Sequence, residues 1–195
     1  LQRSKWESNC RKIAKKNGVS FVGQSKLKDV PEAQVLDSRP PVVPINQMFQ
    51  HFIGWEIKAP LGSFNAKNAI LMDFRCDQSR GIHFIYVLPF SSNKALIEST
   101  MFAPKREPDT FFETAIETYL SKHYGICDFT IMRVEKGGIP LGRISSSKGA
   151  GIGFGANGEA IRPSSGYAFA FIQKQILATI QHAKRRDLHG NTSCP

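Results

Sequence analysis

Three glycines near the end of the chain have the spacing of a phosphate-binding turn. Gly153, Gly155 and Gly158 form a G-x-G-x-x-G motif, which in dinucleotide-binding domains joins a strand directly to a helix that faces a pyrophosphate. Here Pro163 follows Gly158 before any helical pattern begins, and residues 170–186 contain no acidic residue that could bind a ribose. The motif is therefore not the fingerprint that binds the ADP half of a dinucleotide.

The same stretch, "GFGANGEAIRPSSGYAF" at 153–169, suits a different contact with an anionic ligand. Glycines allow the backbone to approach a flat ligand closely. A helix predicted to run from about Ser165 to Arg186 would also present free N–H groups and the positive end of its dipole. The alternative is a glycine-rich turn that only precedes a buried helix, and these residues alone leave both interpretations open.

The middle of the chain is predicted to form an antiparallel sheet. Alternating apolar residues and short polar turns predict strands at 47–57, 69–77, 81–91, 94–103 and 129–142. We expect the first four to form a meander. Residues 84–90 are apolar on both faces of their strand, so we expect the sheet to be covered on both sides.

Two further helices and three short strands complete the prediction. One helix spans 4–17, and another spans 109–123 with a capping box of Thr110 and Glu113 and a stop at Gly125. Short strands are expected at 19–23 and at 151–155. Another is expected within 33–44, where prolines stop it.

Composition and charge restrict the class of protein. The 195 residues are 41% hydrophobic and 22% charged, which is typical of a globular fold, and the net charge is +10. The basic residues before Asp29 and at Lys184 to Arg186 would attract nucleic acid or an anionic membrane, or they form an ordinary solvated surface. No apolar stretch is long enough to span a bilayer. The four cysteines lack metal-binding spacing, so we expect reduced thiols in a cytoplasmic protein and no metal site.

Several segments, in order, resemble the bacterial flavoprotein type of lycopene cyclase from about residue 45 to 180. They are "QHFIGWEI", "LMDFRCDQ", "FIYVLPFSSNKALIESTMF", "EKGGIPLG" and "GEAIRPSSGYAF". The segment "VLDSRP" likewise resembles the Asp-x-Arg end of the first part of a flavin domain.

The resemblance implies an α/β (α+β) fold in which an antiparallel-sheet substrate domain packs on a Rossmann-like FAD-binding domain remnant formed by both chain ends. The implied parts are residues 1–39 from the first FAD-domain segment, the substrate domain at 40–148, and a flavin-contacting strand with the last helix at 149–195. The family opens with a βαβ unit that carries the ADP-binding glycines. We therefore expect this chain, which begins with Leu1, to be the C-terminal half of a cyclase, to bind FAD weakly alone, and to be inactive alone.

The family reaction cyclises the linear ends of lycopene to β-ionone rings, without net redox change. It needs a general acid, a dry cavity and negative charge near a carbocation. Glu98 in "LIEST" matches the first Glu of a Phe-Leu-Glu-Glu-Thr-like motif, whereas the second acidic position is Ser99. Glu98 should share a strand face with Leu96 and Thr100, where apolar surroundings would raise its pKa and keep it protonated. Asp73 is a second catalytic candidate, although it could equally pair with Arg75 or Arg80.

The resemblance also implies reduced FAD as cofactor, NAD(P)H as its reductant and lycopene as substrate, on a peripheral membrane protein that does not bind nucleic acid. The implied cofactor-binding residues are Asp37, Arg39, Gly158, Glu159, Pro163, Ser164, Ser165, Gly166 and Tyr167. Glu135 in "EKGGIPLG" matches a family motif with an expected structural role at a turn.

Two other classes remain as alternatives. One is another FAD-dependent oxidoreductase of the same superfamily, a prenyl reductase or monooxygenase, although "LIEST" and "GGIPLG" follow the order seen in cyclases. The other is a non-catalytic basic module that binds lipid headgroups or nucleic acid.

Overall fold

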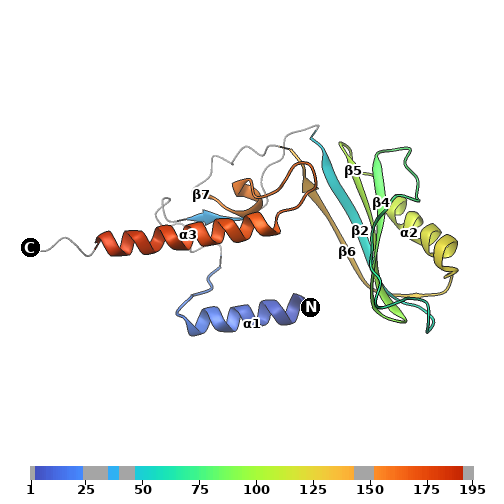
Figure 1. Ribbon diagram of the computed structural model, residues 1–195, viewed down its shortest axis with the longest axis horizontal. Helices are drawn as coiled ribbons and strands as arrows, with labels where there is room; N and C mark the ends of the chain where they lie inside the picture. Colours follow the sequence, from blue (N-terminus) through green and yellow to red (C-terminus); the bar gives the residue numbers. More distant parts are fainter. Residues whose placement is uncertain (1–2, 24–34, 40–46, 143–151, 191–195) are drawn as a thin grey trace, which may run out of the picture. The chain divides into compact units, whose positions relative to one another are not determined.

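The computed structural model describes residues 3–23, 35–39, 47–142 and 152–190 (Figure 1). The chain divides into two compact units, each of which is described by itself. One comprises residues 1–35 with 150–152, and the other comprises 36–149 with 153–195. The boundaries expected from the sequence, 1–39, 40–148 and 149–195, stay a prediction.

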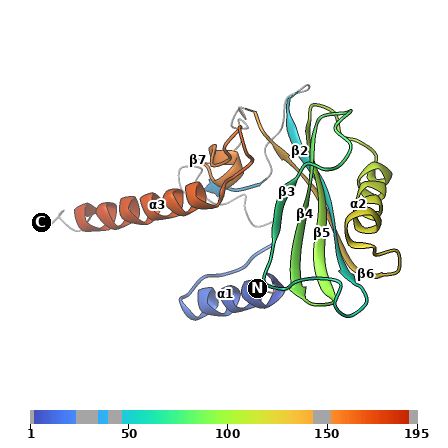
Figure 2. The same ribbon diagram turned by 45° about the vertical axis from the view of Figure 1, so that its right-hand side comes forward.

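A five-stranded antiparallel sheet forms the body of the second unit (Figure 2). Its strands, in sequence order, are β2 (Phe49–Lys58), β3 (Ile70–Asp73), β4 (Ile82–Ser91), β5 (Lys94–Ala103) and β6 (Thr130–Pro140). The spatial order is β3-β4-β5-β2-β6, so the predicted meander holds for β3 to β5 but is wrong for β2. Strand β2 pairs with β5 along its whole length and with β6 on its other side, and it is therefore a central strand.

Helix α2 (Asp109–Tyr124) covers one face of this sheet (Figures 1 and 2). The predicted helix is confirmed, and its apolar side packs on the sheet, because Phe112, Ile116 and Leu120 are buried in one cluster with isoleucines and a valine of the sheet. Gly125 ends the helix in the left-handed conformation; its N–H donates to the Ser121 carbonyl at 3.1 Å, and the N–H of Ile126 donates to the Leu120 carbonyl at 3.2 Å. The predicted capping box is wrong. The helix begins at Asp109 after Pro108, so Thr110 already lies inside the first turn and no side chain caps the helix.

One buried polar pair lies between α2 and the sheet. His83 Nε2 is 2.8 Å from Ser99 Oγ, and both residues are fully buried. His83 Nδ1 lies 2.8 Å from the carbonyl of Asp77, which can only accept, so Nδ1–H donates there and Ser99 donates to Nε2. Burial lowers the pKa of His83, which favours this neutral form.

The opposite face of the sheet carries the other residues of each alternating strand. The ring of Phe84 lies here, with its centroid 5.6 Å from Phe74, 5.3 Å from Tyr86 and 5.5 Å from Phe102. Phe84 is fully buried, and three aromatic rings contact it. The expectation of a sheet covered on both sides is confirmed for the face that α2 covers. On the opposite face, aromatic side chains pack against one another.

Segments near the two ends of the chain meet, as the split flavin domain predicts. Strands β1 (Leu36–Asp37) and β7 (Ile152–Gly153) form a two-stranded sheet. The N–H of Ile152 donates to the Val35 carbonyl and that of Phe154 to the Asp37 carbonyl, each at 2.8 Å. The mixed α/β fold with an antiparallel sheet is therefore confirmed.

The remaining elements differ in detail from the prediction. Helix α1 (Arg3–Lys16) is present in the first unit, but residues 19–23 are exposed and form no strand. A short 3₁₀ helix, η3 (Gly155–Gly158), follows β7, and α3 (Phe169–Gly190) begins four residues after the expected Ser165. The later start follows from Gly166, whose left-handed backbone (φ 69°) closes a turn just before the helix.

The buried pair predicts a measurable loss of stability in Ser99→Ala. The variant leaves the acceptor nitrogen of His83 buried without a donor, which should cost about 1–3 kcal/mol of unfolding free energy in urea titrations. Thr114→Ala, an exposed change on α2, should alter that free energy by less than about 0.5 kcal/mol. Equal stability of both variants would contradict the hydrogen bond.

Candidate functional site

Glu98 lies in the centre of the sheet, on the face opposite α2. It shares this face with Leu96 and Thr100, as the strand alternation predicts, and the Thr100 hydroxyl donates to Glu98 Oε1 at 2.9 Å. In the sheet register, Glu98 stands opposite Tyr86 of β4 and Gly54 of β2. The carboxyl group therefore has an aromatic residue on one side and no side chain on the other.

The surroundings of Glu98 favour its neutral form. Burial is the largest cause of a raised pKa at this carboxyl, and the charge of Glu135 on β6 adds to it. The hydrogen bond from Thr100 works in the opposite direction. Because the pKa of Glu98 is raised above its ordinary value, this residue retains its proton to a higher pH than an exposed glutamate does.

Asp73, the second catalytic candidate, lies on the other side of the sheet. It accepts from the Tyr119 hydroxyl of α2, and it forms an ion pair of 2.6 Å with Arg75. The Arg75 guanidinium holds the pKa of Asp73 well below its ordinary value. The structure thus does not bring Asp73 and Glu98 together, and it favours the ionised form of Asp73.

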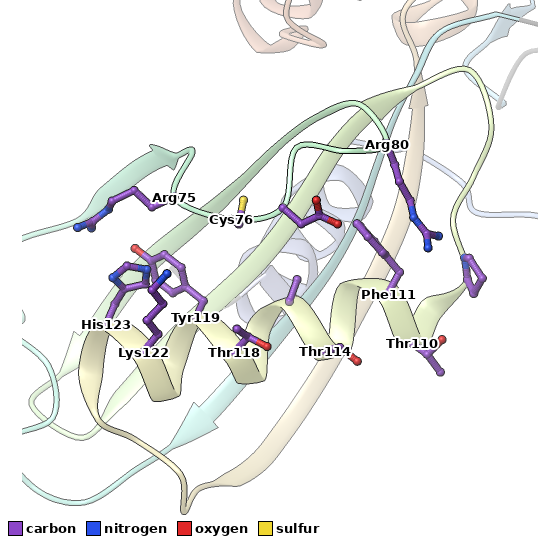
Figure 3. A pocket seen from close by; sticks show the side chains of 13 residues that line it. Arg75, Cys76, Arg80, Thr110, Phe111, Thr114, Thr118, Tyr119, Lys122 and His123 are labelled. Atoms are coloured by element: carbon purple, nitrogen blue, oxygen red, sulfur yellow. The ribbon is translucent and has the colours of Figure 1, made fainter.

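A groove of about 940 Å³ runs between α2 and the segment 75–80 (Figure 3). Figure 3 shows Thr110, Thr114 and Thr118 along the helix, with Arg75 and Arg80 across from them. Both arginines are already paired, Arg75 with Asp73 and Arg80 with Glu107 at 2.6 Å. This groove lies on the α2 side of the sheet, so Glu98 takes no part in it.

The Asp-x-Arg segment is held by its own ion pair. Arg39 donates to Asp37 through Nε at 2.8 Å and through Nη2 at 2.6 Å, and its backbone N–H adds a third bond at 3.0 Å. These bonds lower the pKa of Asp37 to about 2. The carbonyl of Asp37 accepts from the side chain of Asn157, so the segment is tied to the glycine-rich turn.

The glycine-rich turn is packed against itself and against α3. A Cβ at Gly158 would lie 2.5 Å from the Gly153 carbonyl oxygen, and a Cβ at Gly153 would lie 2.4 Å from the Asn157 carbonyl oxygen. Neither glycine therefore tolerates a side chain unless the backbone moves. Gln175 of α3 accepts from the N–H of Gly155 at 2.9 Å and donates to the carbonyl of Gly158 at 2.5 Å. These contacts give the glycines a structural role, which was one of the two interpretations of the motif.

The other cofactor candidates follow on an exposed turn. These candidates are Glu159, Pro163, Ser164, Ser165, Gly166 and Tyr167. Glu159 has a left-handed backbone. The N–H groups of Ser165 and Gly166 both donate to the carbonyl of Arg162, at 3.1 and 2.8 Å. A Cβ at Gly166 would contact the side-chain oxygen of Gln50, which lies on the Glu98 face of β2. The turn and the carboxyl group of Glu98 therefore lie on the same side of the sheet.

Two contributors to these sites, Gly54 and Gln175, were missed in the sequence, and a third, Glu135, was assigned to a different place. Gly54 interrupts the alternation of its strand, and an isolated glycine inside a strand pattern is a signal of close approach that could have been used. Glu135 was expected at a turn but lies within β6. Gln175 gives no signal in sequence, because a half-buried glutamine on a helix is not distinguishable from an exposed one.

The chain is similar to known proteins in sequence and in fold. Residues 2–190 match the family described as "Lycopene cyclase protein". The chain belongs to the lycopene cyclase family. Within this family, it is 33% identical over 104 residues to a lycopene beta-cyclase of Pantoea ananas and 32% identical over 97 residues to one of Pseudescherichia vulneris. Each match covers 48% of this chain and 24% of the relative, so it spans about a quarter of the curated proteins.

A solved structure shares the fold of this lycopene cyclase family member. It is a geranylgeranyl bacteriochlorophyll reductase-like protein from Thermoplasma acidophilum, with a TM-score of 0.55 and 11% identity. The similarity covers 78% of this chain and 37% of that protein.

No helix within the described ranges is both long and apolar enough to cross a bilayer.

The ion pair of Asp73 predicts a stability loss in Asp73→Asn that depends on pH. Since the folded pKa is lowered, the stabilisation is present above the ordinary pKa of 3.8 and lost as the pH falls through the lowered value. At pH 7 the free energy of unfolding of the variant should be lower than that of the natural protein by about 1–3 kcal/mol. This difference in unfolding free energy should shrink below about pH 4. Urea unfolding of both proteins, at pH 7 and again below about pH 4, measures this difference. Asp128→Asn, at an exposed position, should change little, and a pH-independent loss in Asp73→Asn would contradict the ion pair.

Proposed function

We propose that the full-length protein is a lycopene β-cyclase, an isomerase that closes the linear ends of lycopene into β-ionone rings, with Glu98 as proton donor. The observation that carries this proposal is the place of Glu98: its partly buried carboxyl group lies beside Tyr86 on an aromatic face of the sheet, where burial raises its pKa. Family membership and the two named relatives support the substrate class.

The proposed reaction begins with proton transfer from Glu98. Its O–H bond breaks, and the proton forms a new C–H bond at the terminal double bond of the carotenoid, which leaves a tertiary cation and a carboxylate. A neighbouring double bond captures the cation and closes the ring. A ring carbon then releases one proton, so that the reaction has no net uptake of protons or electrons.

The aromatic residues beside Glu98 suit a cationic intermediate. In register, Tyr86 stands next to Glu98, while Phe84 and Phe52 flank Thr100 on either side. The negative faces of such rings attract a cation, and a desolvated contact of this kind contributes about 2 kcal/mol. The same rings exclude water, which would otherwise trap the cation as an alcohol.

We further propose that FAD binds at the exposed turn. The residues fit such a group, because Ser164, Ser165 and Tyr167 are exposed there and Asn157 Oδ1 is buried beside it without a protein partner in the described residues. Asp37, Arg39, Gly158, Glu159, Pro163 and Gly166 complete the proposed contact surface. Reduced FAD would supply negative charge near the cation, and NAD(P)H would serve as its reductant.

The net charge suggests how the protein reaches a substrate that dissolves in lipid. A charge of +10 favours binding to anionic headgroups, and each basic residue near the surface contributes about 1 kcal/mol. We therefore propose a cytoplasmic protein that acts as a peripheral membrane enzyme, and we assign the basic residues to lipid rather than to nucleic acid.

Glu98→Gln tests the proton donor. In the full-length protein, this variant should abolish conversion of lycopene to β-carotene in a lycopene-accumulating host, because general acid catalysis contributes about 10²–10⁴ in rate. Chromatography of the pigments measures the outcome. Asp77→Asn is the control, since Asp77 lies in a turn where it accepts from Ser79, and it should retain most activity. Normal β-carotene from Glu98→Gln would remove Glu98 from the mechanism.

Tyr167→Ala tests the proposed flavin contact. The side chain is 52% exposed, so its removal should not disturb the fold, but it should weaken FAD binding several-fold if the ring lies against the cofactor. Titration of the full-length apoprotein with FAD, followed by flavin fluorescence, measures the affinity. Leu177→Ala, 59% exposed on α3, is the matched control and should bind FAD normally. Equal affinity of the two variants would place the flavin elsewhere.

A further inference from the structure

A second carboxyl group faces Glu98 across the sheet. Gly54 of β2 pairs with Glu98 on one side and with Glu135 of β6 on the other. Residues that stand opposite each other in an antiparallel sheet point to the same face. Glu98 and Glu135 are thus next neighbours on this face, separated only by the glycine.

The missing side chain at Gly54 is what lets them approach. A Cβ at this position would lie 3.2 Å from Cγ and 3.5 Å from Oε1 of Glu135, and 3.2 Å from Cδ1 of Leu96. The side chain of Glu135 therefore leans over the glycine, toward the strand that carries Glu98. Any larger residue at 54 would push the two glutamates apart.

Arg133 holds Glu135 in this place. Its guanidinium lies 3.2 Å from Glu135 Oε2 and 3.2 Å from Glu56 Oε2, so it joins two carboxylates of neighbouring strands. Among the described residues of this sheet, the ionisable groups nearest to Glu98 in the register are Tyr86 on β4, Glu56 on β2, and Arg133 with Glu135 on β6. One guanidinium charge is thus shared between two carboxylates, so this group of three side chains carries a net negative charge.

We propose that Glu135 is a positioning residue for the reaction given above. Its negative charge, brought close by Gly54, makes ionisation of Glu98 unfavourable and so favours the protonated form of the proton donor. This inference rests on the proposed function of Glu98. Burial is the first cause that raises the pKa of Glu98, and Glu135 acts in the same direction. A like charge near a carboxyl group disfavours its ionised form.

The test is a titration of Glu98 in the full-length protein with Glu135→Gln. Infrared spectroscopy follows the protonated carboxyl band, which is assigned to Glu98 by its absence in Glu98→Gln. We expect the midpoint to fall by about 1 pH unit in Glu135→Gln and to stay in place in Glu135→Asp, which keeps the charge. Glu117→Gln, on the exposed side of α2, should leave the midpoint unchanged.

Activity provides the second readout. If Glu98 loses its proton at a lower pH, the alkaline limb of the pH–rate profile should shift down by the same amount, and turnover above it should fall about ten-fold. At low pH, where Glu98 is protonated in both proteins, the rates should agree. A structural role for Glu135 would instead lower the rate equally at every pH.

An unchanged midpoint in folded Glu135→Gln overturns the proposal, whatever the activity. Failure of the proposed function gives a different result, since full cyclase activity in Glu98→Gln shows that Glu98 is not the donor even where the midpoint shifts. The two results come from separate measurements, and each is decisive for its own hypothesis.

Discussion

The candidate site depends on the register of four neighbouring strands. Strand β2 lies between β5 and β6, and this arrangement brings Tyr86, Glu98, Gly54 and Glu135 into one row across the sheet. A shift of one residue in any pairing would turn these side chains to the α2 face. The register is fixed by burial on that face, where residues such as Ile53, Ile85 and Ile97 are almost completely inaccessible. The packing of the helix-covered core therefore determines the geometry on the opposite face.

The glycine-rich segment shows how a motif can match while its function differs. Gly153 and Gly158 have the spacing of a dinucleotide fingerprint, but they allow the turn to fold back on itself beneath Gln175. No helix begins on the motif, and α3 starts only at Phe169. What the segment contributes is a link between distant parts of the sequence, because Asp37 and Phe154 are joined through the backbone. Such a link is what a domain divided between two stretches of chain requires.

The sequence allowed much of this fold to be predicted, for identifiable physical reasons. The long strands and α2 were found because burial imposes strict periods of two and of about 3.6 residues on their side chains. The position of β2 between β5 and β6 was not found, since pairing partners of equal apolar character are interchangeable in sequence. Glu98 was placed on its correct face from alternation alone, but its neighbour Glu135 could not be found, because the pairing of β2 with β6 joins residues about 80 positions apart.

Alternation along β5 has a consequence for the two positions 98 and 99. Glu98 and Ser99 are adjacent in sequence, but one faces the aromatic side of the sheet and the other donates to His83 beneath α2. Two adjacent strand residues cannot serve one cavity, so a pair of acidic residues here would not act as a chemical pair. The acidity of the proposed proton donor and the thermal tolerance of the fold thus depend on different residues, one peptide bond apart. A change at the first position would therefore act on the proposed chemistry and a change at the second on heat resistance, with little interference between the two.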